Sequence, residues 1–177
     1  MIYIINGFPG SGKTTFEEMV GDLTDEYICG LSTVTYVKRI AFECGWDGKK
    51  TPEARKFLSD LKKLMNEFNE LPRLKTLENA KLYKWAFIDC REPEEIDWFK
   101  EQLGDKVKTV VIRRPDVEGA PQSNSSDANV LNYNYDIEIW NDGTRRDLAE
   151  KALKFVEDEG LKKRTDPFYI DLFGDID

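Results

Sequence analysis

Eight consecutive residues near the start of the chain, Gly7 to Thr14 (GFPGSGKT), have types and a spacing that suggest chemistry. They satisfy G-x-x-x-x-G-K-[ST] between a β-forming run and a helix-forming run, which is the context that this motif requires. Glycines let the backbone turn with positive φ and bring its N–H groups close to phosphate oxygens, and the following helix points its positive end at the same place. We expect Lys13 to reach the β- and γ-phosphates of a bound triphosphate and the Thr14 hydroxyl to bind Mg²⁺. The alternative is a glycine-rich turn that binds nothing, which requires the four fixed positions to coincide by chance.

A single acidic residue follows a second apolar run, AFIDCR. Asp89 lies where a buried strand would emerge beside the glycine-rich loop, so we expect it to hold Mg²⁺ through water or to accept a proton from an attacking oxygen. Arg91 follows two residues later and can share its face, and phosphoryl transfer needs such a carboxylate and guanidinium. The alternative is a surface ion pair at a strand end. A GTPase would usually have an N-K-x-D segment and a motor ATPase two consecutive acids after the apolar run, and this sequence has neither.

Further arginines are candidates for contacts with phosphate groups. Arg113 and Arg114 end another apolar run just before a loop, so they could move onto the phosphates when the loop closes. Arg55, near the start of a long helix, is a candidate for binding a phosphate on the acceptor. For all three the alternative is ordinary solvated surface charge.

The hydrophobic pattern predicts an α/β fold that positions these residues. Apolar runs at 2–5, 26–31, 83–89, 107–114 and 135–140 are typical of strands, and the segments between them have helical spacing. Strands that alternate with helices predict a three-layer fold of the P-loop NTP hydrolase type. We expect a parallel sheet of about five strands, helices on both faces, and ligands at the carboxyl ends of the strands.

The longest predicted helix begins at Pro52, after Thr51 as its cap. Its apolar residues form one stripe, which we interpret as a face buried in the core. The stripe consists of Ala54, Phe57, Leu58, Leu61, Leu64, Met65 and Phe68.

Composition limits the class of protein. The 177 residues suffice for one domain, the net charge of −8 argues against a broad nucleic-acid surface, and no apolar run is long enough to span a membrane. The opening MIYIIN lacks the basic stretch of a secretory signal, so we expect a cytoplasmic location. Three isolated cysteines and no histidine argue against a zinc site or a Cys/His nucleophile. We expect a domain over 1–160, with a candidate acceptor-binding helical region at 31–83 and a candidate lid loop at 114–134, and a tail at 161–177 whose role stays open.

In order along the chain, GFPGSGKTT, FIDCREPEEIDWFKEQLG, KTVVIRRP and IWNDGTRRDLAEKAL resemble segments of P-loop kinases of the phage deoxynucleoside monophosphate kinase type and of the related animal-type phosphomevalonate kinases. The resemblance implies a nucleoside monophosphate kinase-like fold and transfer of the ATP γ-phosphoryl group to a phosphate monoester. It implies that Arg91 and Arg55 lie near the acceptor phosphate, and that Asn141 and Asp142 lie near the donor base. A turn and helix start would also explain Asn141 and Asp142. The segment 31–83 has no close match to either subgroup.

The leading hypothesis is therefore a kinase that uses ATP and Mg²⁺ and phosphorylates a small phosphate-bearing molecule, above all a (deoxy)nucleoside monophosphate. A kinase for another phosphorylated metabolite is one alternative, and a nucleotide-binding regulatory module with slow ATPase activity is another. Catalytic roles are expected for Lys13, Asp89, Arg91, Arg113 and Arg114, and acceptor binding for Arg55 and Arg91, with Thr14 and Asp89 as metal ligands. The residues expected to bind ATP are Gly7, Pro9, Gly10, Ser11, Gly12, Lys13, Thr14, Thr15, Asn141 and Asp142.

Overall fold

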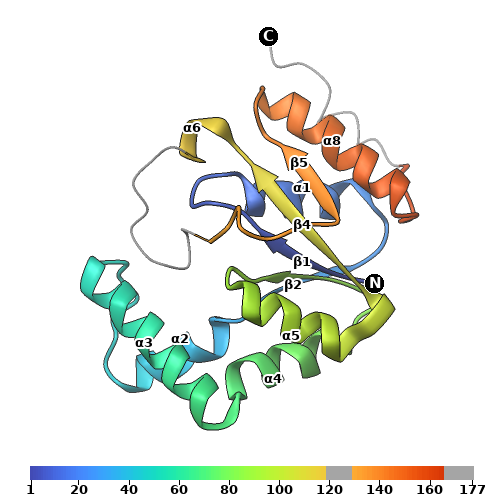
Figure 1. The fold of residues 1–177 in the computed structure, drawn as a ribbon. Helices are drawn as coiled ribbons and strands as arrows, with labels where there is room; N and C mark the ends of the chain where they lie inside the picture. The colour runs from blue at the N-terminus through green and yellow to red at the C-terminus, as the bar shows by residue number, and fades with distance from the viewer. Residues whose placement is uncertain (119–128, 166–177) are drawn as a thin grey trace.

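The computed structural model describes residues 1–118 and 129–165 and shows a single parallel sheet between two layers of helices (Figure 1). The five strands lie in the order β2-β3-β1-β4-β5, and every neighbouring pair is parallel. This confirms the predicted α/β fold class. The strands are β1 (Ile2–Asn6), β2 (Ile28–Ser32), β3 (Trp85–Asp89), β4 (Val107–Arg113) and β5 (Ile137–Trp140).

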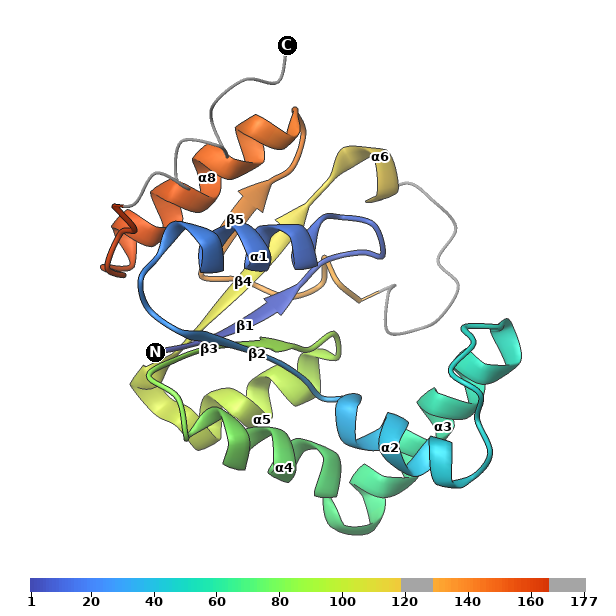
Figure 2. The same ribbon diagram turned by 180° about the vertical axis from the view of Figure 1, so that it is seen from behind.

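The two faces of the sheet are covered by different helices, which Figures 1 and 2 show from opposite sides. Alternate residues of β1 point to opposite faces, so Tyr3 and Ile5 pack toward α1 and α8 while Ile2 and Ile4 pack toward α4 and α5. Because both faces are covered, β1 is buried along its whole length. The helices are α1 (Lys13–Leu23), α2 (Thr35–Glu43), α3 (Pro52–Asn69), α4 (Leu71–Ala80), α5 (Pro93–Leu103), α6 (Pro115–Glu118) and α8 (Arg145–Asp158), with a 3₁₀ turn over Gly104–Lys106.

Helix α3 corrects one prediction. Its apolar stripe is not a core face: Phe57, Leu64 and Phe68 are 39%, 63% and 83% exposed. The helix lies beyond the edge of the sheet against α2 and α4, where the other four residues of the stripe are half-buried and none is fully buried. The helical period therefore identified the stripe correctly but not its surroundings.

Local capping explains where several helices begin and end. The Thr51 side chain accepts a hydrogen bond from the Ala54 amide at the start of α3. Thr144 and Asp147 form a capping box at the start of α8. Gly104, with a φ of 56°, ends α5. None of the described helices has the length and apolar character needed to cross a lipid bilayer.

Two predicted segments are described only in part. The predicted loop 115–129 begins as the short helix α6, and its residues 119–128, which lie in the candidate lid loop 114–134, are outside the described residues. Of the tail, residues 161–165 are described: Lys163 forms an antiparallel bridge with Thr24, and the Arg164 amide donates to the Leu23 carbonyl at 2.9 Å. The beginning of the tail therefore lies against the end of α1.

The centre of the α1 layer supplies a stability prediction. Phe16 is fully buried and packs edge-on against Phe87 and Phe155. Phe16→Ala should lower the free energy of unfolding by about 3–5 kcal/mol, because it removes buried ring contacts and leaves a cavity. Urea denaturation measures this loss. The half-exposed Phe57→Ala is the control, and an equal loss in both variants would contradict the assignment of Phe57 to an uncovered face.

Candidate active site

The loop between β1 and α1 adopts the conformation that its glycines permit. Gly7, Gly10 and Gly12 have φ values of 147°, 82° and 98°. A Cβ atom on Gly7 would lie 2.6 Å from Ser11 Oγ and 2.7 Å from the Ile112 carbonyl oxygen, so the loop has no space for a side chain there. Within the described chain no side chain caps the start of α1, which leaves the first-turn amides available to an anion.

Two side chains of the loop suit a phosphate ligand. Lys13 Nζ donates to the Gly7 carbonyl at 2.6 Å, so the ammonium group lies over the loop that precedes it. Ser11 Oγ is buried and has no hydrogen-bond partner in the described part of the chain. Such a hydroxyl is costly to leave unmatched, and a phosphate oxygen would accept its hydrogen bond. The predicted triphosphate site therefore fits the residues that form the loop.

Asn6, which the sequence reasoning missed, holds the beginning of the loop. Its side chain is fully buried, and Oδ1 accepts from the Gly7 amide at 2.8 Å. Nδ2 donates to the Tyr135 hydroxyl at 2.7 Å and to the Arg91 carbonyl at 3.3 Å. Asn6 thus connects the loop to the segment that carries Arg91. A polar residue in the otherwise apolar run before Gly7 was the signal in the sequence.

Asn141 holds the other end of the loop. Its Nδ2 donates to the Ser11 carbonyl at 2.8 Å, and its amide donates to the Arg113 carbonyl at 2.7 Å. This side chain therefore supports the loop from the end of β5. Contact with a donor base stays a prediction for Asn141 and Asp142.

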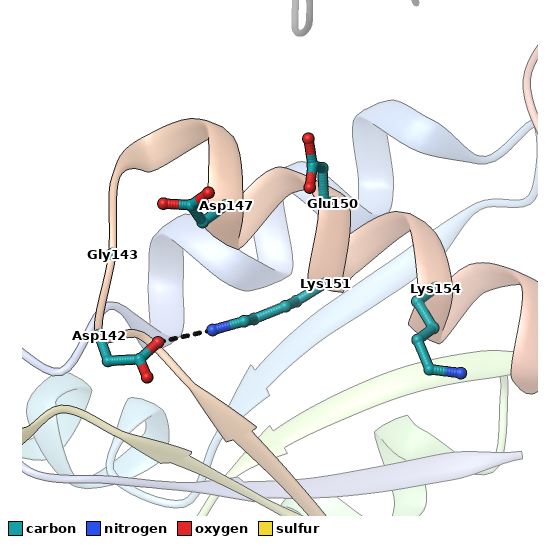
Figure 3. Close-up of a pocket in the computed structure, with 6 residues that line it drawn as sticks. All are labelled: Asp142, Gly143, Asp147, Glu150, Lys151 and Lys154. Atoms are coloured by element: carbon teal, nitrogen blue, oxygen red, sulfur yellow. Dashed lines mark hydrogen bonds and ion pairs between the residues drawn. The ribbon is translucent and has the colours of Figure 1, made fainter.

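Asp142 lies beside Asn141 at the edge of an open hollow of about 350 Å³ (Figure 3). Its Oδ1 is 2.7 Å from Lys151 Nζ, and the ion pair spans the hollow from the turn to α8. The lining residues are Asp142, Gly143, Asp147, Glu150, Lys151 and Lys154.

Asp89 lies next to the glycine loop between β1 and α1, at the strand end where the sequence predicts it. It ends β3 and is the register partner of Ile5 in β1, two residues before Gly7. Burial raises the pKa of Asp89 above its usual value. The positive charges of Lys13, Arg91 and Lys38 oppose this rise, so the three cations act on one carboxylate. The structure thus brings together Lys13, Asp89 and Arg91.

Two further charged residues of this cluster were not predicted. Burial, followed by the negative charge of Asp89, raises the pKa of Glu17 to about 8, and Lys13 opposes the rise. Glu17 Oε1 is buried without a hydrogen-bond partner in the described chain. The position of Glu17, one helical turn after Lys13, was a signal that could have found it. Lys38 comes from α2, and only the folded chain places it near Asp89.

The other predicted arginines differ in their surroundings. Arg113 makes two hydrogen bonds to Glu118, at 2.7 and 2.8 Å, and its guanidinium lies 4.6 Å from the Trp140 ring centre. Arg114 Nη1 donates to the Gly10 carbonyl at 3.4 Å, so it contacts the loop directly. Arg55 is exposed, and its Nε donates to the Lys50 carbonyl at 3.4 Å. The structure therefore shows Arg114 at the loop, Arg113 engaged by Glu118 and Arg55 in a local contact on α3.

Thr14 and Asp89 are the residues that would hold a magnesium ion. Thr14 is exposed in the first turn of α1, and Asp89 ends the neighbouring strand. Hydroxyl and carboxylate oxygens are hard ligands of the kind that Mg²⁺ prefers. The donor set therefore fits this ion.

Gly12 supplies a direct test of the loop. A Cβ atom there would lie 2.5 Å from Asn141 Nδ2, at a φ of 98°. Gly12→Ala should weaken ATP binding about tenfold, because the loop would shift to relieve a strain of about 1–3 kcal/mol and lose its fit to phosphate, and about 1.4 kcal/mol corresponds to tenfold in affinity. Titration calorimetry with ATP measures the change. Gly21→Ala in α1 is the control, since its Cβ would meet no described atom within 4 Å; unchanged affinity in Gly12→Ala would contradict the site.

Comparisons with known proteins show the fold. No protein-family model matches the chain, and no curated protein sequence matches it. Among solved structures, the tunicamycin resistance protein of Deinococcus radiodurans matches with a TM-score of 0.54 and 15% identity, over 93% of this chain and 98% of that one. Shikimate kinase from Aquifex aeolicus matches with a TM-score of 0.50 and 14% identity, over 90% of this chain and 98% of that one. At these identities the chain is similar to both in fold, and that fold is of the P-loop kinase type.

Proposed function

We propose that the protein is an Mg·ATP-dependent small-molecule kinase that transfers the γ-phosphoryl group of ATP to a phosphate monoester, in the first place a (deoxy)nucleoside monophosphate. The observation that carries this proposal is the meeting of Lys13, Asp89 and Arg91 beside a glycine loop that leaves the first amides of α1 uncapped. Phosphoryl transfer needs cations that neutralise charge on the transferred group, and Arg91 after β3 would supply a second one beside Lys13. The likeness in fold to shikimate kinase agrees with a phosphotransferase.

The donor side of the site would bind the triphosphate. The loop amides and Ser11 Oγ would donate hydrogen bonds to phosphate oxygens, and Lys13 would leave the Gly7 carbonyl to neutralise charge on the β- and γ-phosphates. Thr14 and Asp89 would hold Mg²⁺, which supplies further neutralisation of the phosphate charge when bound. Arg114 is placed at Gly10 to contact the same phosphates.

The acceptor side would be formed by Arg91 and Lys38. Their positive charges converge on Asp89, and both would hold the acceptor phosphate in line with the γ-phosphorus. An acceptor phosphate oxygen then forms the new P–O bond while the bond to the β–γ bridging oxygen breaks and ADP leaves. Because this oxygen is already anionic near neutral pH, the reaction needs no histidine.

An acceptor with a free hydroxyl is a second candidate, and one observation favours it. Burial and then the negative charge of Asp89 raise the pKa of Glu17 to about 8, so Glu17 is a carboxylate above about pH 8, and its buried, unmatched oxygen can then accept a hydroxyl proton. In this reaction the proton moves to the carboxylate as the alcohol oxygen attacks. The two candidates share the donor side and differ in the acceptor.

A panel of acceptors tests the proposal. ADP release is followed with Mg·ATP alone and with the four deoxynucleoside monophosphates, their ribose counterparts, phosphomevalonate and unphosphorylated polyols. Stimulation by a nucleoside monophosphate, with the diphosphate as product, is the expected result. Stimulation by phosphomevalonate or by polyols alone would move the assignment to those acceptors. Absent or acceptor-independent turnover would contradict the kinase and favour a regulatory module.

A further inference from the structure

The one buried side chain of helix α3 is charged. Lys62 is its one buried residue, 8% exposed, among 18 residues. No apolar side chain of α3 is fully buried, and Phe57, Leu64 and Phe68 are exposed, so hydrophobic burial fixes this helix only in part. A buried charge therefore marks the place where α3 meets the body of the protein.

The partners of Lys62 lie in the segment that follows β3. Its Nζ is 2.7 Å from Glu95 Oε2 and 2.9 Å from Glu92 Oε2, and Glu95 is also buried. Burial alone would lower the pKa of Lys62, but the negative charges of Glu95 and Glu92 outweigh it and hold this pKa above its usual value. Cys90 completes the group, because its thiol donates to Glu95 Oε2 at 3.1 Å. We call Lys62, Cys90, Glu92 and Glu95 the Lys62 cluster.

Two members of the Lys62 cluster are the sequence neighbours of Arg91. Cys90 precedes Arg91 and Glu92 follows it, so both neighbours of this arginine are members. The Cys90 amide donates to the Ile5 carbonyl at 3.2 Å, and Asn6 Nδ2 donates to the Arg91 carbonyl. Before Arg91, the backbone is thus fixed by the hydrogen bond from Cys90 to β1. After Arg91, it is fixed by the ion pair between Glu92 and Lys62 of α3.

A metal ion is a less suitable occupant of this group. One ligand atom from each of Cys90, Glu92 and Glu95 can be chosen so that all lie within 4.8 Å of one another. The ammonium group of Lys62 already binds both carboxylates, so the chain itself supplies the cation. We therefore interpret the cluster as a connection between two elements.

We propose that Lys62 is a positioning residue: its buried ion pairs with Glu92 and Glu95 fix α3 against the segment after β3 and so set the place of Arg91 on the acceptor side of the site. The inference rests on the proposed function, because it assigns Arg91 to the acceptor. It extends that function by making acceptor binding depend on a residue outside the charged group around Asp89. Breaking the connection should disturb the acceptor side more than the loop that binds ATP.

The kinetic test uses Lys62→Met, which keeps the length of the side chain and removes its charge. With the nucleoside monophosphate that gives the fastest ADP release, KM for this acceptor should rise about tenfold, while KM for ATP stays within about twofold, since a lost charge-assisted contact is of this size. Lys62→Arg should restore most of the loss. Lys56→Met is the matched control, because Lys56 lies on the same helix, is exposed and pairs with Asp60. Equal changes in both KM values, or none, would overturn the proposal.

Hydrogen exchange tests the connection without any turnover. In Lys62→Met, amides in 52–69 and 90–95 should exchange at least tenfold faster, whereas those of β1 and α1 keep their rates. If the unaltered protein phosphorylates nothing but this pattern appears, the proposed function fails and the connection stands. If exchange does not change in either segment, the connection itself is wrong. Should Lys62→Met fail to fold, Glu92→Gln removes one of the two ion pairs and is read by the same two measurements.

Discussion

Replacing Lys13 by alanine is expected to lower the rate of ADP formation about 10³-fold and to leave the fold intact. The ammonium group is the cation of the glycine loop, and it lies over the Gly7 carbonyl at 2.6 Å, where the terminal phosphates of ATP would lie. Charge that develops on the transferred phosphoryl group would lose its nearest fixed counter-charge. The residual activity would come from Arg114 and from the loop amides, which the substitution does not remove.

The measurement is the steady-state rate of ADP release at saturating ATP and acceptor, together with the thermal unfolding midpoint. Lys63→Ala is the control, because this lysine is exposed on α3 and pairs with Glu67 at 3.8 Å. Its rate should equal that of the unaltered protein. A Lys13→Ala variant that keeps its full rate would refute the donor site, and one that loses rate and stability together would leave only a structural role for the residue.

The elements of the fold were predictable because their signals are local. A threonine cap before Pro52 and the Thr144 capping box are each decided within four residues of sequence, and both are present. The place of an element in the molecule is not a local property. The stripe of α3 has a regular helical period, yet the period cannot tell how far other elements cover it, and in the structure none of its residues is fully buried.

The candidate site likewise contains residues that the sequence predicts and residues that only the fold brings near. Lys13 was found from the glycine-loop motif that follows β1 and Asp89 from its place at the end of β3, and the parallel pairing of β1 with β3 brings the two regions together. Lys38 could not be found, since α2 and β3 are separated by a long stretch of chain. Arg113 was expected to be available for phosphates, but Glu118, five residues later, holds its guanidinium. That pairing depends on the turn of α6, which the loop-like composition of this segment did not predict.

The Arg91→Ala variant should lower kcat/KM for the acceptor about 10²-fold, with little change in the affinity for ATP. Arg91 follows the strand that ends at Asp89, and its positive charge opposes the burial-driven rise in the pKa of that carboxyl group. A cation at this place would bind an acceptor phosphate that must approach a negatively charged donor, so its removal affects the acceptor first. Arg91→Lys should recover part of the activity, because a point charge replaces the forked guanidinium.

The decisive comparison is between acceptor kinetics and ATP binding in the same variant. Initial rates over a range of acceptor concentration give kcat/KM, and calorimetric titration gives the dissociation constant for ATP. Arg146→Ala is the control, since Arg146 is exposed on α8 and pairs with Glu150 at 3.6 Å. If Arg91→Ala changed only the unfolding midpoint, Arg91 would be one half of a strand-end ion pair. A selective loss in acceptor kinetics would instead place the acceptor phosphate between β3 and α2, on the side of Asp89 where Lys38 also acts.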